Sequence, residues 1–234
     1  MGVRAQAQDA EGAADAELEA LQDGLDACCT LQAATVTFIG VARQLGADGV
    51  LDLGPETVRF LRAAQCQDEA HYHFYQRLGA RAFVTEFAMP AGSLADRDAF
   101  LQTLIELEGI AVGAGMALAR RFAEYADFNL VEIAYQMGAV DAQHLALARH
   151  LLGAVPANER AFAEWRYFDL LEVEDALYDS GFVDEGDDLI AFPGPVARNC
   201  AGVFGLVPKT TDDARLLLPP ADIEAVATPA AGDE

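Results

Sequence analysis

Two short stretches of the sequence each place a carboxylate three residues before a histidine. The first, DEAH, runs from Asp68 to His71, and the second, DAQH, runs from Asp141 to His144. On a helix, residues three positions apart share a face and lie about 4.5 Å apart along the axis, so each pair can ligate one metal ion. Two such pairs on facing helices can hold metal ions side by side, and the sequence therefore predicts a helix-borne metal site.

A third carboxylate stands within an apolar stretch. In LIELEGIAVG, Glu108 lies in the middle of the apolar run, whereas Glu106, two residues earlier, is predicted to face solvent. A lone glutamate in an apolar stripe is costly to bury unless it is paired with a cation. Glu108 is therefore predicted to join the same site.

The carboxylate–histidine stretches also allow other interpretations. The letters DEAH also spell a helicase signature, but no GxxxxGK[ST] loop lies upstream and the letters lie inside a helical pattern. A single carboxylate–histidine pair is most simply a solvated acid beside a core histidine, but two matching copies favour a shared core cluster. Whether that cluster binds metal or is a buried hydrogen-bonded remnant stays open. His73 and His150 are predicted to lie outside it, because they are rotated away from His71 and His144 on their helices.

Four long amphipathic segments must position these side chains. Their apolar residues recur at steps of three and four, which is typical of helices with one buried face. Pro55 suits a first helical turn, Ser93 with Asp96 resembles a capping box, and either Asp127 or Asn129 caps the last helix. The predicted helices cover residues 17–46, 55–79, 94–125 and 127–153.

The segments divide the chain into a predicted all-α core with two tails. Gly109, Gly113 and Gly115 interrupt the third helix, and they predict either close approach of another helix or room for something bound. Trp165 is predicted to anchor the C-terminal part to the bundle. The predicted regions are a disordered tail (1–15), an antiparallel four-helix bundle (16–156), an extension of short helices and irregular wrap (157–218) and a flexible tail (219–234).

The composition limits the partners and the location of the protein. The formal charge of −23 argues against nucleic-acid binding. The apolar stretch 109–119 is too short to span a membrane by itself, and no secretory signal is recognisable at the N-terminus. Without a CxxC spacing, the cysteines at positions 28, 29, 66 and 200 are predicted to be buried free thiols, which fits a reducing compartment. These features predict a cytoplasmic protein without a membrane partner.

Three stretches together resemble a ferritin-like domain protein, of the group in which a C-terminal extension follows the bundle. They are QDEAHYHFY, FLQTLIELEGIAVGAG and AVDAQHLALARHLLG, with GF…FPGP downstream resembling the extension, and the resemblance covers about residues 20–195. It implies an antiparallel four-helix bundle around a carboxylate-bridged di-iron or di-manganese centre. The family's ligands are a Glu on helix one, a Glu on helix three, and Glu-x-x-His on helices two and four. The implied metal ligands in this chain are Asp68, His71, Glu108, Asp141, His144 and Gln32.

The chain departs from the family pattern at three places. Aspartates stand at positions 68 and 141, where the family has glutamates, and a shorter side chain bridges two metals less easily. The candidate helix-one positions hold Gln32 and Thr35, neither of which is acidic. The carboxylate count therefore falls from the family's four to three, and one ion, two ions or none stay open.

The resemblance implies two alternative functions. In the first, iron or manganese in the bundle core reacts with oxygen or peroxide, as in a ferroxidase-type or peroxide-type oxidoreductase. In the second, the protein is a non-catalytic ferritin-like stress or interaction protein that has lost its metal centre. Metal ions are the predicted partners, and a homodimer through bundle faces is left open.

Overall fold

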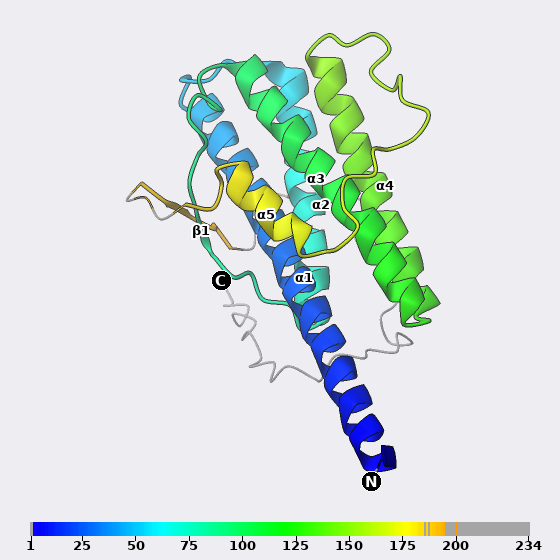
Figure 1. Ribbon diagram of the computed structural model, residues 1–234. Helices are drawn as coiled ribbons and strands as arrows, with labels where there is room; N and C mark the ends of the chain where they lie inside the picture. The colour runs from blue at the N-terminus through cyan, green and yellow to red at the C-terminus, as the bar shows by residue number, and fades with distance from the viewer. Residues whose placement is uncertain (1, 185, 187, 195–199, 201–234) are drawn as a thin grey trace, which may run out of the picture.

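The protein is mostly helical, and its helices pack against one another (Figure 1). The computed structural model describes residues 2–184, 186, 188–194 and 200, with side chains from residue 16 onward. The predicted tail over 219–234 and most of the last part of the extension lie outside the described residues. The elements are α1 (Gly2–Ala47), α2 (Gly54–Arg77), β1 (Glu86–Phe87), α3 (Arg97–Glu124), α4 (Phe128–Leu151), α5 (Glu172–Asp179) and β2 (Ile190–Ala191).

The long helices α1 to α4 lie side by side, and the short helix α5 packs on α1 and α3 (Figure 1). The closest pairs are α1 with α2 and α3 with α4, and α1 also contacts α3 as α2 contacts α4. Phe38 of α1 lies at the centre of this core. Its ring centroid is 5.0 Å from that of Phe100 and 5.2 Å from that of Phe182, so α1, α3 and the segment after α5 share one aromatic contact.

The first helix is longer than predicted. It begins at Gly2, whereas residues 1–15 were predicted to be a disordered tail from their polar, acidic composition. The segment contains five Ala and two Gln, which have high helix propensity, and it contains no proline. Local propensity therefore outweighed the absence of an apolar stripe.

The starts of α2 and α4 agree with the predictions to within one residue, whereas the cap of α3 differs. Asp96, and not Ser93, is the N-cap of α3, because its side chain accepts a hydrogen bond from the backbone N of Ala99 at 2.8 Å. Ser93 is buried in the preceding turn. Asp127 caps α4 by accepting from the backbone N of Leu130 at 3.1 Å, which decides between the two predicted candidates.

For the α3 glycines, the prediction of close approach by another helix is confirmed, whereas the alternative of room for something bound stays a prediction. A Cβ added to Gly115 would lie 3.3 Å from Cα of Gly138, so these glycines let α3 and α4 approach closely. A Cβ on Gly109 would lie 2.9 Å from Cζ of Arg166, so the extension docks there. Trp165 is 64% exposed, and the prediction that it anchors the extension is wrong, because the neighbouring Arg166 occupies that place on α3.

The loop between α2 and α3 is tied to the extension by a small sheet. Glu86 pairs with Ala191 and Phe87 with Ile190 in an antiparallel register. The backbone N of Ala88 also donates to the carbonyl O of Phe182 at 3.0 Å. The extension predicted as irregular wrap thus includes a strand, which needs a partner distant in sequence and cannot be recognised from the local pattern.

Two of the four cysteines are buried free thiols, as predicted, and the other two are not. Cys66 and Cys200 form a disulfide across 134 residues, whereas Cys28 and Cys29 are buried free thiols. The pairing carries no sequence signature, because it depends on how the extension returns to α2. Since disulfides persist mainly in oxidising compartments, the cysteines no longer support a reducing one, and the cytoplasmic location stays a prediction.

Two helices are long and apolar enough to cross a membrane by length and composition alone, namely α1 over Ala16–Ala47 and α3 over Arg97–Glu124. The apolar stretch 109–119 is part of this longer α3, so its own short length does not exclude a span. Most of each apolar window is buried inside the protein, as in core helices of soluble proteins, and the finding is weak evidence for a membrane.

The disulfide makes a testable prediction about thiol count and stability. We expect two titratable thiols per denatured chain without reductant and four after reduction, because only Cys28 and Cys29 are free.

Replacing both bridged residues by Ser should lower the free energy of unfolding by about 2–5 kcal/mol, measured by urea denaturation, because the long loop is no longer closed. Native wild type should react slowly with thiol reagents, since burial raises the pKa of the Cys28 thiol to about 12. Four thiols without reductant would contradict the assignment.

Candidate metal centre

Three helices bring the predicted ligands together in the core. The carboxylate–histidine spacing puts both members of each pair on the inward face of α2 or α4, and Glu108 projects from α3 between them. All of these side chains are buried. They are Asp68 and His71 from α2, Glu108 from α3, and Asp141 and His144 from α4.

Four of these residues form one compact donor set. Asp68, Glu108, Asp141 and His144 each offer a ligand atom, and these atoms all lie within 4.8 Å of one another. Nδ1 of His144 is 3.3 Å from Oδ1 of Asp68 and 3.2 Å from Oε1 of Glu108. His71 adjoins the set, with Nδ1 3.1 Å from Oδ1 of Asp141.

The two carboxylate–histidine pairs interlock. His71 of the first pair meets Asp141 of the second, and His144 of the second meets Asp68 of the first. The sequence predicts that each pair serves one ion. The structure instead joins each histidine to the carboxylate of the opposite helix, because facing side chains reach across the gap between α2 and α4.

The converging atoms approach one another without forming hydrogen bonds. Six buried atoms have no hydrogen-bond partner among the described residues, although nitrogen and oxygen lie only 3.1–3.3 Å apart. Buried polar atoms are normally paired, so such a group needs a further partner. The six atoms are both carboxylate oxygens of Asp68, Oε1 of Glu108, Oδ1 of Asp141 and Nδ1 of His71 and of His144.

Gln67 sets the orientation of His144. Nε2 of His144 lies 2.8 Å from Oε1 of Gln67, and this amide oxygen only accepts hydrogen bonds, so Nε2 carries the hydrogen. When Nδ1 loses its proton, its lone pair is directed into the carboxylate cluster and is available to a metal ion. Gln67 was not among the residues predicted for the site, although it directly precedes Asp68 in the sequence.

The buried charges shift the proton affinities within the cluster. Burial, together with the nearby Asp68 and Asp141, raises the pKa of Glu108 to about 8. Burial alone would lower the pKa of His144, but Glu108 and Asp68 raise it well above its ordinary value. Without a cation, the cluster therefore holds protons that the same groups would release in water, and a bound metal would displace them.

The sixth predicted ligand lies on α1. Gln32 is buried, and its Oε1 has no hydrogen-bond partner among the described residues. Thr35, the other candidate on this helix, donates its hydroxyl to the carbonyl O of Leu31 at 3.0 Å. The assignment of Gln32 as a ligand stays a prediction.

The remaining histidines lie outside the cluster, as predicted. His73 is half-buried, with Nδ1 2.9 Å from Oε1 of Gln76 and Nε2 3.6 Å from Oε1 of Glu69. His150 is exposed near the end of α4. Glu106 also faces solvent and pairs with Arg166 at 3.5 Å.

The donor set suits a single ion. At metal–ligand distances of about 2.0–2.2 Å, neighbouring ligand atoms lie about 2.8 Å apart at right angles and up to about 3.6 Å apart in a tetrahedron. The His144–Asp68 and His144–Glu108 separations, 3.3 and 3.2 Å, fall within this range. The buried Asp, Glu, Asp and His group could therefore bind a metal ion.

Comparison with known proteins adds no homologue to this picture. A scan against protein-family models finds none that matches the chain, and searches of curated proteins and of solved structures find no match either.

The raised pKa of Glu108 makes a testable prediction for metal-free protein. The carboxyl group of Glu108 has its ordinary pKa of 4.5 in the unfolded chain and a pKa of about 8 in the folded protein. Between these two pH values it is protonated when the protein is folded and ionised when the protein is unfolded. The stabilisation by this proton is complete below pH 4.5 and is lost as pH rises toward 8. Glu108→Gln, which stays neutral, should therefore gain unfolding free energy relative to wild type as pH rises, by at most about 1.4 kcal/mol per pH unit.

The measurement is urea denaturation in the presence of a chelator at several pH values between about 5 and 8. The matched control is Glu106→Gln, which makes the same change two residues away at an exposed position. Its stability should follow wild type at every pH. Parallel profiles for Glu108→Gln and Glu106→Gln would contradict the prediction.

Proposed function

We propose that this protein is a ferritin-like antiparallel four-helix bundle whose core binds one iron or manganese ion for redox chemistry. The single observation that carries the proposal is the set of buried, unpartnered ligand atoms from α2, α3 and α4. Leaving several charged groups unpaired in a core is costly, and a cation removes that cost. The order of helix contacts and the ligand-bearing motifs on α2 and α4 support the bundle assignment.

Charge balance favours one ion over two. Three carboxylates supply three negative charges, which neutralise one trivalent ion and leave one surplus charge beside a divalent ion. Two divalent ions would instead leave a net positive charge in an apolar core, which is unfavourable. A dinuclear centre in this fold needs a fourth carboxylate, and α1 carries Gln32 at the candidate position.

The ligand types favour iron or manganese. Carboxylate oxygens suit hard cations such as manganese, and imidazole suits iron and zinc, so a mixed set with more oxygen than nitrogen fits iron or manganese best. Such an ion supplies one-electron chemistry with oxygen or peroxide when bound. The residues of the chain hold the site in place, with Gln67 fixing the ring of His144 at 2.8 Å.

A second candidate function follows from the ion pairs within the cluster. His144 lies between Asp68 and Glu108, and its raised pKa means that the protonated ring partly neutralises both carboxylates without metal. A ferritin-like stress or interaction protein could keep such a remnant as a polar core. Metal content separates the two candidates.

Metal analysis is the direct test. Full-length protein loaded with iron or manganese and then desalted should retain about one ion per chain, measured by elemental analysis. The His71→Ala/His144→Ala variant should retain none, because two of the ligand side chains are removed. Absence of metal from loaded wild type would leave only the second candidate function.

The matched control removes the other two histidines. His73→Ala/His150→Ala makes the same chemical change on the same helices, but neither ring lies in the cluster. This variant should bind as much metal as wild type. If it lost metal equally, the loss would be due to general destabilisation rather than to the ligands.

Restoring an acidic residue on α1 tests the nuclearity of the site. Gln32→Glu should raise metal content from about one to about two ions per chain, because a fourth carboxylate balances the second divalent charge. Gln44→Glu, on the exposed face of the same helix, is the control and should leave the content at one. Unchanged content in Gln32→Glu would show that Gln32 does not face the centre.

A further inference from the structure

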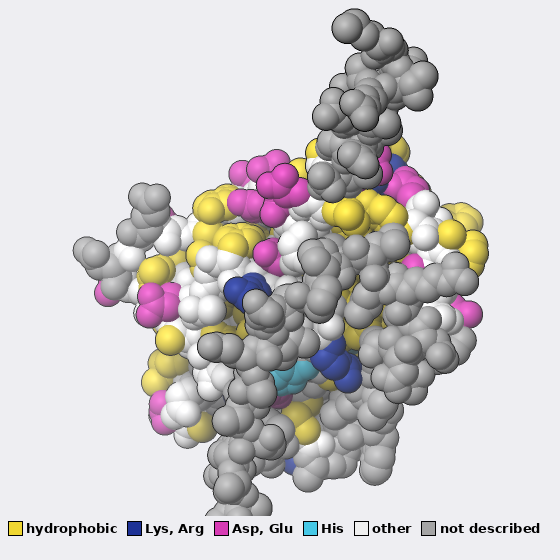
Figure 2. Space-filling view, turned by 90° about the horizontal axis from the view of Figure 1, so that it is seen from below, with side chains coloured by type: hydrophobic (Ala, Val, Ile, Leu, Met, Phe, Trp, Pro, Cys, Tyr) yellow, Lys and Arg dark blue, Asp and Glu magenta, His cyan; other side chains and the backbone are white. Residues whose placement is uncertain are grey.

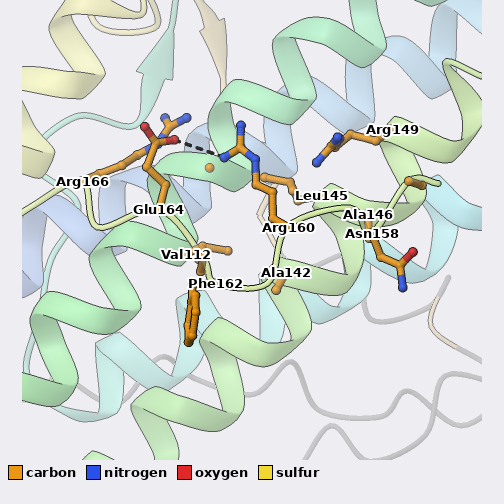
Figure 3. Close-up of a pocket in the computed structure, with 13 residues that line it drawn as sticks. Val112, Ala142, Leu145, Ala146, Arg149, Asn158, Arg160, Phe162, Glu164 and Arg166 are labelled. Atoms are coloured by element: carbon orange, nitrogen blue, oxygen red, sulfur yellow. Dashed lines mark hydrogen bonds and ion pairs between the residues drawn. The ribbon is translucent and has the colours of Figure 1, made fainter. Parts of the chain in front are cut away.

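A cavity of about 170 Å³ lies on the outer side of α3 and α4, away from the metal cluster (Figure 3). The segment that follows α4 closes it, and this segment contributes Asn158, Arg160 and Phe162 to its wall. The helices contribute apolar side chains, including Val112 from α3 and Leu145 from α4. The cavity thus has an apolar body and is independent of the residues proposed as metal ligands.

Three arginines gather at this cavity. Figure 3 shows the head groups of Arg149, Arg160 and Arg166 along one side, with Phe162 and Val112 toward the other. Positive charge is scarce in this protein, which has 15 basic and 38 acidic residues. Acidic side chains are spread over the face shown in Figure 2, whereas basic ones form only small groups there. Three guanidinium groups and one carboxylate, that of Glu164, therefore line this cavity, so positive charges outnumber negative ones in its wall.

The present partners of these arginines are replaceable. Arg160 pairs with Glu164 at 3.3 Å, and Arg149 pairs with Glu159. Arg166 pairs with Glu106 at 3.5 Å and with Glu164 at 3.4 Å. All three glutamate side chains are more than half exposed. Exposed ion pairs contribute little, so an anion that enters the cavity can take the place of the glutamates. The arginine fork suits two-point hydrogen bonding to a carboxylate or phosphate.

The size of the cavity defines the rest of the ligand. A cavity of about 150 Å³ is large enough for benzene. The ring of Phe162 lines the mouth and is 88% exposed, so it is free to cover a flat apolar group. We propose that this cavity binds a small organic anion, a carboxylate or phosphate carried on an apolar body about the size of a benzene ring.

The cavity and the proposed metal centre lie on different faces of the same two helices, α3 and α4. Gly109 directly follows Glu108, and Ala142 directly follows Asp141, so each helix carries a cavity residue beside a cluster residue. Successive helical residues point about 100° apart, which places the cavity and the cluster on different faces of the same two helices. Binding at the cavity requires no metal, so its test is separate from the metal analysis.

The test compares ligands that differ only in charge. Isothermal titration calorimetry on the full-length, chelator-treated protein would use benzoate, phenyl phosphate and the neutral benzamide. We expect at least one of the two anions to bind saturably with one site per chain, and benzamide to bind at least about tenfold more weakly. The stronger of the two anions identifies carboxylate or phosphate as the preferred head group.

Substitutions of the cavity arginines then test whether the anion binds at this cavity. Arg149→Met and Arg160→Met should each weaken binding of the preferred anion about tenfold, because each removes a charged hydrogen-bond donor. Arg97→Met causes the same change in net charge at an exposed position that pairs with Asp98, and it should bind like wild type. Circular dichroism checks that each variant is folded.

Two results would overturn the proposal. The first is no saturable binding of either anion to wild type, or equal binding of benzamide and the anions, which needs no variant to interpret. The second is equal weakening by Arg97→Met and Arg149→Met in folded proteins, because the effect would then arise from net charge alone.

Discussion

The structure depends on the burial of three carboxylates and two imidazoles at the centre of the helices. Charged groups lose much of their solvation in such a place, and only close opposite charge or a cation compensates for the loss. The interlocked pairs, His71 with Asp141 and His144 with Asp68, provide part of that compensation. They also tie α2 to α4 by polar contacts, so the centre both requires and maintains the helix arrangement.

Close approach of the surrounding elements buries this polar centre. Gly115 and Gly138 bring the backbones of α3 and α4 together beside it. On the outer face, Gly109 leaves space for the Arg166 side chain. The extension therefore packs against α3 at the residue that directly follows Glu108. Glycines that weaken a helix as an isolated segment are thus used here for packing. The disulfide from Cys66 to Cys200 adds a covalent link between α2 and the extension.

Two different faces of α3 and α4 carry side chains that suit ions of opposite charge. The inward face of α3 and α4 holds Glu108, Asp141 and His144, which suit a cation. The outward face, with Arg149 and the extension, forms the arginine-lined cavity, which suits an anion. A helix can support both because residues one position apart point in different directions. Three arginines at one cavity stand out in a chain with 15 basic and 38 acidic residues.

Much of the candidate site could be predicted because it depends on local spacing. A carboxylate three residues before a histidine shares its helix face whatever the rest of the fold does, and Glu108 was identifiable as an acid in an apolar stripe. The positions of α2 and α4 and the place of His73 outside the cluster follow from the same periodicity. Each of these features involves residues within a few positions of one another.

Contacts between distant residues were decided only by the tertiary structure. They include the crosswise pairing of the two motifs, the strand pair of Phe87 with Ile190 and the disulfide from Cys66 to Cys200. Gln67 was overlooked because glutamine has many roles, and only its distance to His144 shows that it orients the ring. The sequence by itself determined which side chains share a helix face, because helical geometry is local. Which faces meet, which cysteines pair and where the extension docks depend on packing between segments far apart in the chain.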